Sequence, residues 1–256
     1  MSRRSIRAVG FFLLFYLLFG AWLTVQQERI VYQPGSRPFA ECPALADAER
    51  VTHQGTRAYL RDTGQPMAVL YHGNAGTACD RAFLAERFVA AGYDYLLVEY
   101  AGYAGDPTPP SHERIRTDVR NVIDLIEERD LGPIALIGES IGAGVASSHS
   151  ALAPPERLLL LSPFPDLQAV AATRFWFYPT SLLVENAYAP QVDLREYPGP
   201  ITIVHGTDDR IIPFRLGEEL YRNLSGEKTL FPVAGAGHND LFRFATTTTA
   251  LTSFLQ

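Results

Sequence analysis

Short apolar runs alternate with helix-like patterns along the chain from residue 67 onward. The runs predict strands at Met67–Tyr71, Tyr93–Tyr100, Pro133–Gly138, Arg157–Leu161, Ile201–His205 and Thr229–Val233. Amphipathic or small-residue patterns predict helices at Asp80–Ala91, Ser111–Arg129, Ile141–Ala151, Phe214–Leu224 and Asp240–Phe254. Such alternation predicts an α/β fold with a mainly parallel central sheet flanked by helices on both faces. A ligand site is then expected at the carboxyl ends of the strands.

Three segments do not follow this alternation. Arg50–Asp62 alternates weakly and predicts an early hairpin, and Arg29–Pro38 predicts a strand broken by prolines. Residues 162–200 leave room for a small cap. Its apolar side chains either line an acyl pocket or touch a bilayer surface, or they fill the core of the cap, and the sequence favours neither interpretation. They are Phe164, Phe175, Trp176, Phe177, Tyr178, Leu182 and Leu183.

The N-terminal segment is the most apolar part of the chain. Ala8–Val25 contains no charged residue, and Arg3, Arg4 and Arg7 precede it. As a helix it rises about 27 Å, close to the hydrocarbon thickness of a bilayer. We expect a retained single-pass anchor over residues 1–28, followed by one catalytic domain over residues 29–256. The basic flank is expected to stay in the cytoplasm, which places the catalytic domain on the non-cytoplasmic side.

Two other interpretations of this segment stay open. A cleaved signal peptide has a shorter apolar core and ends at a small-x-small site, and residues 24–28 (TVQQE) offer no convincing one. A buried helix of a soluble protein rarely has this length without a polar face.

Composition narrows the function classes. The 256 residues are 47% hydrophobic and 20% charged, which is typical of a folded protein with a sizeable core. A net charge of −6 gives no basic footprint for nucleic acid. No CxxC or HxxxH spacing suggests a metal site, and none is expected. Cys42 and Cys79 are expected to be unlinked thiols, although an extracytoplasmic location would permit a disulfide between them.

Ser140 is the candidate nucleophile. It lies in GESIG (residues 138–142), a GxSxG motif that follows a predicted strand and begins a predicted helix. The glycines are needed because the serine sits on a tight, strained turn where neighbouring side chains would clash. The helix N-terminus beside it favours developing negative charge.

A nucleophilic serine needs a base and an acid that orients the base. His238, in the loop GAGHND after the last predicted strand, is the candidate base. His149 lies inside the helix that Ser140 starts, and His205 ends a strand ahead of the acid loop, so neither is favoured. The acid is expected in HGTDDRIIP (residues 205–213). Asp209 fits the common HGxxDxxxP pattern and is preferred over Asp208, which then forms the turn.

Tetrahedral intermediates of acyl transfer require two backbone N–H donors. One is expected from Ile141, directly after the nucleophile. The other is expected from Asn74 in HGNAG (residues 72–76), because this loop follows the predicted strand Met67–Tyr71. All these candidates follow strand carboxyl ends, where the predicted sheet places a site.

The motifs HGNAG, GESIGAG, HGTDDRIIP and GAGHND, in this order, resemble one branch of the α/β-hydrolase superfamily. That branch includes membrane-associated serine hydrolases, among them protein palmitoyl thioesterases and lysophospholipases. The resemblance runs from about Arg29 to the C-terminus and includes RIVYQP after the apolar segment. One departure stands at residues 99–104, where EYAGYA replaces a DYRGYG-like stretch that borders the site.

The residues and the resemblance together predict a serine hydrolase that cleaves carboxylic ester or thioester bonds through an acyl-enzyme, without a metal or organic cofactor. The apolar anchor makes lipid-like or acylated substrates plausible. A peptidase or amidase with the same triad is an alternative. A non-catalytic, membrane-tethered binding protein on a hydrolase scaffold is another, although such scaffolds usually lose part of the triad.

Overall fold

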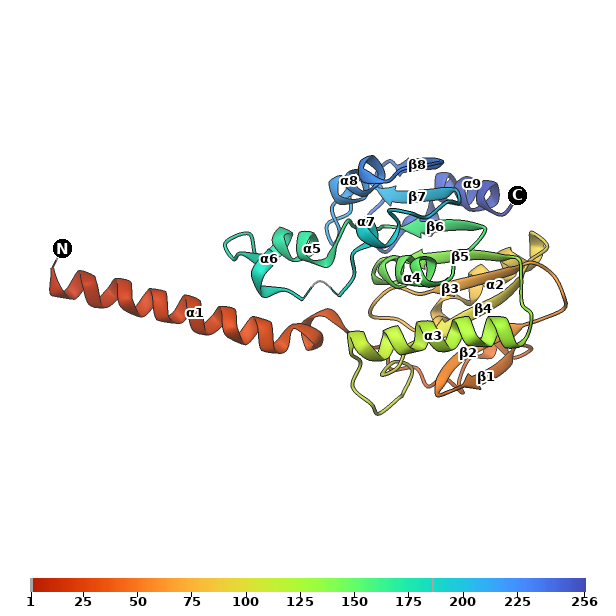
Figure 1. Ribbon diagram of the computed structural model, residues 1–256, viewed down its shortest axis with the longest axis horizontal. Helices are drawn as coiled ribbons and strands as arrows, with labels where there is room; N and C mark the ends of the chain where they lie inside the picture. Colours follow the sequence, from red (N-terminus) through yellow and green to blue (C-terminus); the bar gives the residue numbers. More distant parts are fainter. Residues whose placement is uncertain (1, 186) are drawn as a thin grey trace.

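The computed structural model describes residues 2–185 and 187–256, which contain one twisted sheet of eight strands (Figure 1). The strand order is β1-β2-β4-β3-β5-β6-β7-β8, and β3 to β8 are parallel to one another, as the alternating pattern predicts. The predicted hairpin is confirmed as β1 and β2, which pair antiparallel. The strands are β1 Glu49–His53, β2 Thr56–Arg61, β3 Met67–Tyr71, β4 Asp94–Glu99, β5 Ile134–Glu139, β6 Arg157–Leu161, β7 Ile201–Gly206 and β8 Lys228–Val233.

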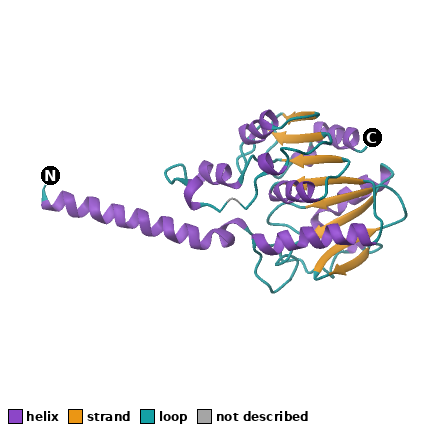
Figure 2. Cartoon of the chain, in the orientation of Figure 1, coloured by secondary structure: helices purple, strands orange, loops and turns teal. Residues whose placement is uncertain are grey.

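Helices cover both faces of the sheet (Figure 2). Val69 and Tyr71 of β3 point into a core that helices α3, α4 and α8 close. Ala68 and Leu70 point into the opposite core, which α2 and α9 close. This two-sided burial explains why inner parallel strands such as β3 and β6 are almost continuously apolar. The helices are α2 Ala82–Ala90, α3 His112–Glu128, α4 Ile141–Leu152, α8 Phe214–Asn223 and α9 Ala245–Phe254, with short 3₁₀ turns η1 Pro43–Leu45, η2 Ala78–Arg81 and η3 Leu241–Arg243.

Helix α1 (Arg3–Val31) extends away from the sheet, on the side toward which the parallel strands point (Figures 1 and 2). Among the described residues it is the one helix long and apolar enough to cross a membrane. The strand predicted across Arg29–Pro38 is wrong. Gln and Glu after Val25 are good helix formers, so the helix runs on until Tyr32 caps it by donating to the Glu28 carbonyl (2.8 Å). Gln33 then precedes Pro34, which disfavours further helix.

Cys42 and Cys79 form a disulfide with Cα atoms 5.7 Å apart, so the expectation of unlinked thiols is wrong. Both cysteines are buried in the core beneath α2, together with Leu45 and Ala82. The segment after α1 lies against this core, and this brings together two residues that are 37 positions apart. Such a tertiary approach cannot be read from the spacing of the two cysteines.

The segment between β6 and β7 forms three short helices: α5 Leu167–Arg174, α6 Thr180–Leu183 and α7 Pro190–Asp193. Helices α5 and α6 lie beyond the carboxyl ends of the strands, on the same side of the domain as α1 (Figure 1). Asp166 caps α5 by accepting from the Ala169 N–H (2.7 Å). We call residues 162–200 the cap.

Candidate active site

Ser140 occupies a strained turn between β5 and α4. Its φ and ψ are 55° and −119°, a conformation that L-residues rarely adopt. Both motif glycines are sterically required. A Cβ on Gly138 would lie 2.4 Å from the Gly142 carbonyl oxygen, and one on Gly142 would lie 2.2 Å from the Tyr71 carbonyl oxygen. The turn therefore has the geometry that the GxSxG motif predicts, with the serine directly before the first residue of a helix.

The structure brings Ser140, His238 and Asp209 together. His238 follows β8, and its Nε2 lies 2.9 Å from Ser140 Oγ. Its Nδ1 lies 2.6 Å from Asp209 Oδ2, in the loop after β7. These three loops all follow strands at the same edge of the sheet, as expected for parallel strands.

Asp209 is held as a carboxylate. Burial favours the protonated form, but the nearby His205 ring and the hydrogen bonds from His238 and the Ile212 N–H outweigh it and hold the pKa of Asp209 well below its ordinary value. Oδ1 accepts from the N–H groups of Ile211 and Ile212, each at 2.8 Å. Because the carboxylate can only accept, His238 Nδ1 carries the proton and Nε2 is free to accept from the Ser140 hydroxyl.

His205 supports the acid loop, a role that the sequence patterns do not separate from an ordinary strand end. Its buried Nε2 donates to the Ile212 carbonyl (2.8 Å) and lies 3.5 Å from Asp209 Oδ2. Gly217 of α8 approaches the ring so closely that a Cβ there would lie 2.1 Å from Nδ1. No local motif marks this role in the sequence, because the contacts of His205 with Asp209, Ile212 and Gly217 form only in the folded chain.

The less favoured candidates lie elsewhere. Asp208 is exposed, and its carboxylate accepts from the Thr207 hydroxyl (3.2 Å). His149 is buried in α4, where Nδ1 bonds the Tyr71 hydroxyl (2.8 Å). Burial lowers the pKa of His149 to about 4, so its ring is neutral at pH 7 and fills the core.

Asn74 and Ile141 lie beside Ser140 and line the same cavity. Ile141 is the first residue of α4, where backbone N–H groups have no partner within the helix. The Asn74 side chain is fixed on both ends. Its Oδ1 accepts from the Gln33 N–H (2.9 Å) and the Tyr103 hydroxyl (2.7 Å), and its Nδ2 donates to the carbonyl of Val31.

The segment 99–104 supports the Asn74 loop from behind. Glu99 accepts from the Ala78 N–H (2.9 Å) and contacts His72 Nε2 (3.2 Å). The Tyr100 hydroxyl donates to the His72 carbonyl (2.7 Å). In the sequence EYAGYA, Glu99 and Tyr100 therefore form hydrogen bonds that hold this loop. Ala101 contributes only its backbone N–H, which donates a hydrogen bond to the Asp118 carboxylate.

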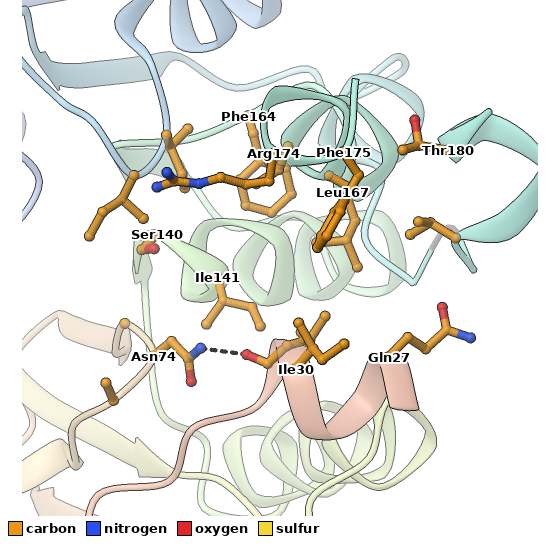
Figure 3. Close-up of a pocket in the computed structure, with 18 of the residues that line it drawn as sticks. Gln27, Ile30, Asn74, Ser140, Ile141, Phe164, Leu167, Arg174, Phe175 and Thr180 are labelled. Atoms are coloured by element: carbon orange, nitrogen blue, oxygen red, sulfur yellow. Dashed lines mark hydrogen bonds between the residues drawn. The ribbon is translucent and has the colours of Figure 1, made fainter. Parts of the chain in front are cut away.

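A cavity of about 410 Å³ opens above Ser140, within the size range of small-molecule sites. Figure 3 shows Ser140 and Asn74 at one end of the cavity, with Phe164, Leu167 and Phe175 along its upper side and Ile30 of α1 along its lower side. Phe164, Phe175, Tyr178 and Leu183 line this cavity. Trp176 and Leu182 are each 81% exposed, so these two do not fill a cap core.

The lining is mainly apolar, and two arginines of the lining, Arg174 and Arg81, make polar contacts. Arg174 donates from the cap to the Arg210 carbonyl (2.8 Å) and extends toward Ser140 (Figure 3). Arg81 forms a bidentate ion pair with Glu139. No group of three or more metal-ligating side chains occurs in the described ranges 2–185 and 187–256.

Known proteins provide an independent comparison. The model of the alpha/beta hydrolase family matches residues 68–189. The uncharacterized protein Rv2307c of Mycobacterium tuberculosis is 32% identical over 228 residues, covering 84% of this chain and 81% of its own length. Lysophosphatidylserine lipase ABHD12 of Xenopus tropicalis is 28% identical and covers 66% of this chain. This chain spans about half the length (49%) of that lipase.

Solved structures show the same fold. Est1E from Butyrivibrio proteoclasticus has a TM-score of 0.65 at 20% identity and covers 81% of this chain and 97% of its own. An esterase from Exiguobacterium antarcticum has a TM-score of 0.63 at 18% identity, covering 82% and 100%. The sheet order, the strand-end site and these likenesses agree: the chain belongs to the alpha/beta hydrolase family.

Proposed function

We propose that this chain is a membrane-anchored serine hydrolase that cleaves carboxylic ester or thioester bonds. Ser140 is the nucleophile, His238 the general base and Asp209 the acid that orients it. The observation that carries the proposal is the continuous hydrogen-bonded chain from Ser140 Oγ through His238 to Asp209, at the end of an apolar cavity. This is the arrangement by which a serine hydroxyl is activated for acyl transfer.

The proposed reaction has two halves. His238 Nε2 takes the Ser140 proton while Oγ attacks the acyl carbon, and the oxyanion accepts from the N–H groups of Asn74 and Ile141. His238 then gives this proton to the leaving alcohol or thiol as its bond to the acyl carbon breaks. Water attacks the acyl-enzyme, loses its proton to His238, and releases the carboxylic acid. The proton then returns from His238 to Ser140 Oγ.

Lipid-like or acylated substrates fit this site best. The cavity wall is mostly aliphatic and aromatic, which favours an acyl chain over a polar one. The ABHD12 relatives, which are 27–29% identical, bear the name lysophosphatidylserine lipase. A single acyl chain is therefore the substrate feature that we carry over to this protein.

We infer that α1 anchors the enzyme with its catalytic domain on the non-cytoplasmic side. Only 6% of the apolar span of α1 is fully buried within the chain, which leaves most of the helix surface free to face lipid. Arg3, Arg4 and Arg7 favour a cytoplasmic N-terminal flank. The Cys42–Cys79 disulfide independently supports an oxidising compartment for the domain.

A fluorophosphonate probe and a substrate panel test the function. We expect the probe to label the wild type and not Ser140→Ala, and the panel to show ester or thioester cleavage. Cleavage of amides in preference to esters would replace the proposal with an amidase. Absence of labelling in a folded wild-type protein would favour a non-catalytic binding role.

A further inference from the structure

One face of α1 packs against the catalytic domain although the rest of the helix is exposed. The partly or fully buried positions recur every three or four residues, which is the spacing of one helix face. They include Tyr16, Phe19, Gly20, Leu23, Thr24 and Gln27. A helix that served only as a tether would not need such a face. This face is turned toward the cap.

The contact with the cap is specific along its whole length. The Tyr16 and Tyr178 rings stack at 4.3 Å between centroids. Gly20 is required there, since a Cβ would lie 2.9 Å from the Tyr178 ring. Thr24 donates to the Leu183 carbonyl (3.3 Å), and Gln27 accepts from the Glu185 N–H (2.9 Å). From Tyr16 to Gln27 the helix rises about 16 Å.

Both tyrosine hydroxyls in this contact are bonded within the protein. Tyr16 Oη donates to the Phe177 carbonyl (2.8 Å), and Tyr178 Oη donates to the Tyr16 carbonyl (2.7 Å). Hydrocarbon offers no hydrogen-bonding partner, so polar groups at that depth must be paired within the protein. Tyr16 lies inside the uncharged stretch Ala8–Val25. The cap segment bonded to it therefore lies at the depth of the hydrocarbon if α1 spans the membrane.

The same face of α1 reaches the cavity above Ser140. Leu23, Thr24, Gln27, Ile30 and Val31 all line it, across from the cap helices. In Figure 3, Gln27 and Ile30 lie on one side of the cavity, and Leu167 and Phe175 lie on the other. The end of α1 also bonds the candidate oxyanion loop through the Val31 carbonyl and Asn74 Nδ2.

We propose that the C-terminal half of α1 is a wall of the substrate pocket. Together with the cap segment 175–183 it forms a lateral entrance, through which the acyl chain of a membrane-resident ester passes from the leaflet to Ser140. The outer surface of this entrance is apolar, with Trp176, Phe177 and Leu182 exposed beside the exposed side chains of α1. The inference rests on the proposed ester hydrolase function. It adds that α1 selects the acyl chain.

Leu23 is the residue on which to test the wall, because it lines the cavity at the middle of the contact. In the full chain reconstituted in lipid vesicles, Leu23→Trp fills part of the channel. We compare kcat/KM for two esters, p-nitrophenyl palmitate and p-nitrophenyl butyrate. We expect the palmitate-to-butyrate ratio of kcat/KM to fall by about tenfold or more in this variant. Leu23→Ala widens the channel and should raise the same ratio. The matched control is Leu18→Trp, since Leu18 is 61% exposed and lies off the packed face.

Equal chain-length ratios for Leu23→Trp and Leu18→Trp would overturn the proposal. Loss of fluorophosphonate labelling would indicate that Leu23→Trp fails to fold. In that case Leu23→Ala tests the proposal, since its palmitate-to-butyrate ratio of kcat/KM is expected to rise. An unchanged ratio in Leu23→Ala would then overturn it. Failure of the proposed function has a different signature, because the wild type itself would neither label nor hydrolyse either ester.

Discussion

At the scale of single residues, Asp208 and Asp209 are neighbours with opposite environments. Asp209 is buried and bonds His238, whereas Asp208 is exposed. We expect Asp209→Asn to lower kcat by about 10³- to 10⁴-fold, because an amide no longer holds the protonated Nδ1 of His238 or stabilises its cation. Asp208→Asn should change kcat by no more than about twofold. Kinetics on both variants check this, and an equal loss in the two would contradict the assignment of Asp209.

Ionisation of Asp118 makes the stability of the fold depend on pH, independently of catalysis. Burial raises the pKa of Asp118 to about 6, although hydrogen bonds from the Thr56 hydroxyl (2.6 Å) and the Ala101 N–H (2.8 Å) oppose this. Because the folded-state pKa exceeds the unfolded value, this group stabilises the fold most at low pH. Its contribution is lost as the pH rises through about 6.

We therefore expect the wild type to lose about 2 kcal/mol of unfolding free energy from this group between pH 4 and pH 7. Asp118→Asn removes the ionisation and should lack this loss. Denaturant unfolding of both proteins at the two pH values measures the difference. If the difference in unfolding free energy between wild type and variant is the same at pH 4 and pH 7, Asp118 does not titrate between these two pH values.

The residues of the candidate site that lie in local sequence motifs can be predicted from the sequence. Ser140 and His238 lie in loops whose glycines and position after a strand indicate their geometry, and the structure brings both together with Asp209. His205 and Tyr103 are not readable in this way. They act through partners that lie far away in sequence or across a turn, and only the packed fold brings those contacts about.

At the scale of elements, the apolar strands of the parallel sheet match their predicted positions to within one or two residues. The inner strands, such as β3 and β6, are buried on both faces and therefore appear as continuous apolar runs, whereas β8 at the edge is only partly buried. The cap helices α5, α6 and α7 carry no comparable pattern. They are four to eight residues long and are held by tertiary bonds, such as those of Gln168 Nε2 to the carbonyls of Ser181 and Val184. Helices this short are not stable on their own.

The tip of the cap provides a prediction about membrane depth. Trp176 is 81% exposed beside α1, and the chain has two tryptophans, so Trp22→Phe leaves Trp176 as the one reporter. In vesicles of lipids with brominated acyl chains, we expect strong quenching of Trp176 fluorescence, because the proposed entrance opens into the hydrocarbon. Trp176→Phe, which retains Trp22 within α1, is the positive control. Efficient quenching of Trp176 by aqueous iodide, with none by the brominated lipids, would place the cap tip in water.

At the scale of the whole molecule, the anchor, the cap and the sheet form one functional unit. The parallel sheet delivers Ser140, His238 and Asp209 to the edge from which α1 extends (Figure 1). The cap and the C-terminal part of α1 both lie beyond that edge, so the site opens on the side of the domain that carries α1. With α1 as the proposed membrane anchor, this site would meet its substrate at the bilayer, where acyl chains are concentrated, rather than in bulk water.

The orientation of the whole chain in the membrane can be tested through its disulfide. In the proposed orientation, Cys42 and Cys79 meet an oxidising compartment, so a maleimide mass tag should react with denatured wild type only after reduction. Replacing Arg3, Arg4 and Arg7 together with glutamate removes the basic flank that favours this orientation. We expect a substantial share of this triple variant to carry two free thiols and to accept two tags without reductant.

The charge-matched control is a second triple variant on the domain surface, which should stay oxidised. It carries Arg114→Glu, Arg120→Glu and Arg222→Glu. Two tags on unreduced wild type would place the domain on the cytoplasmic side and overturn the proposed topology.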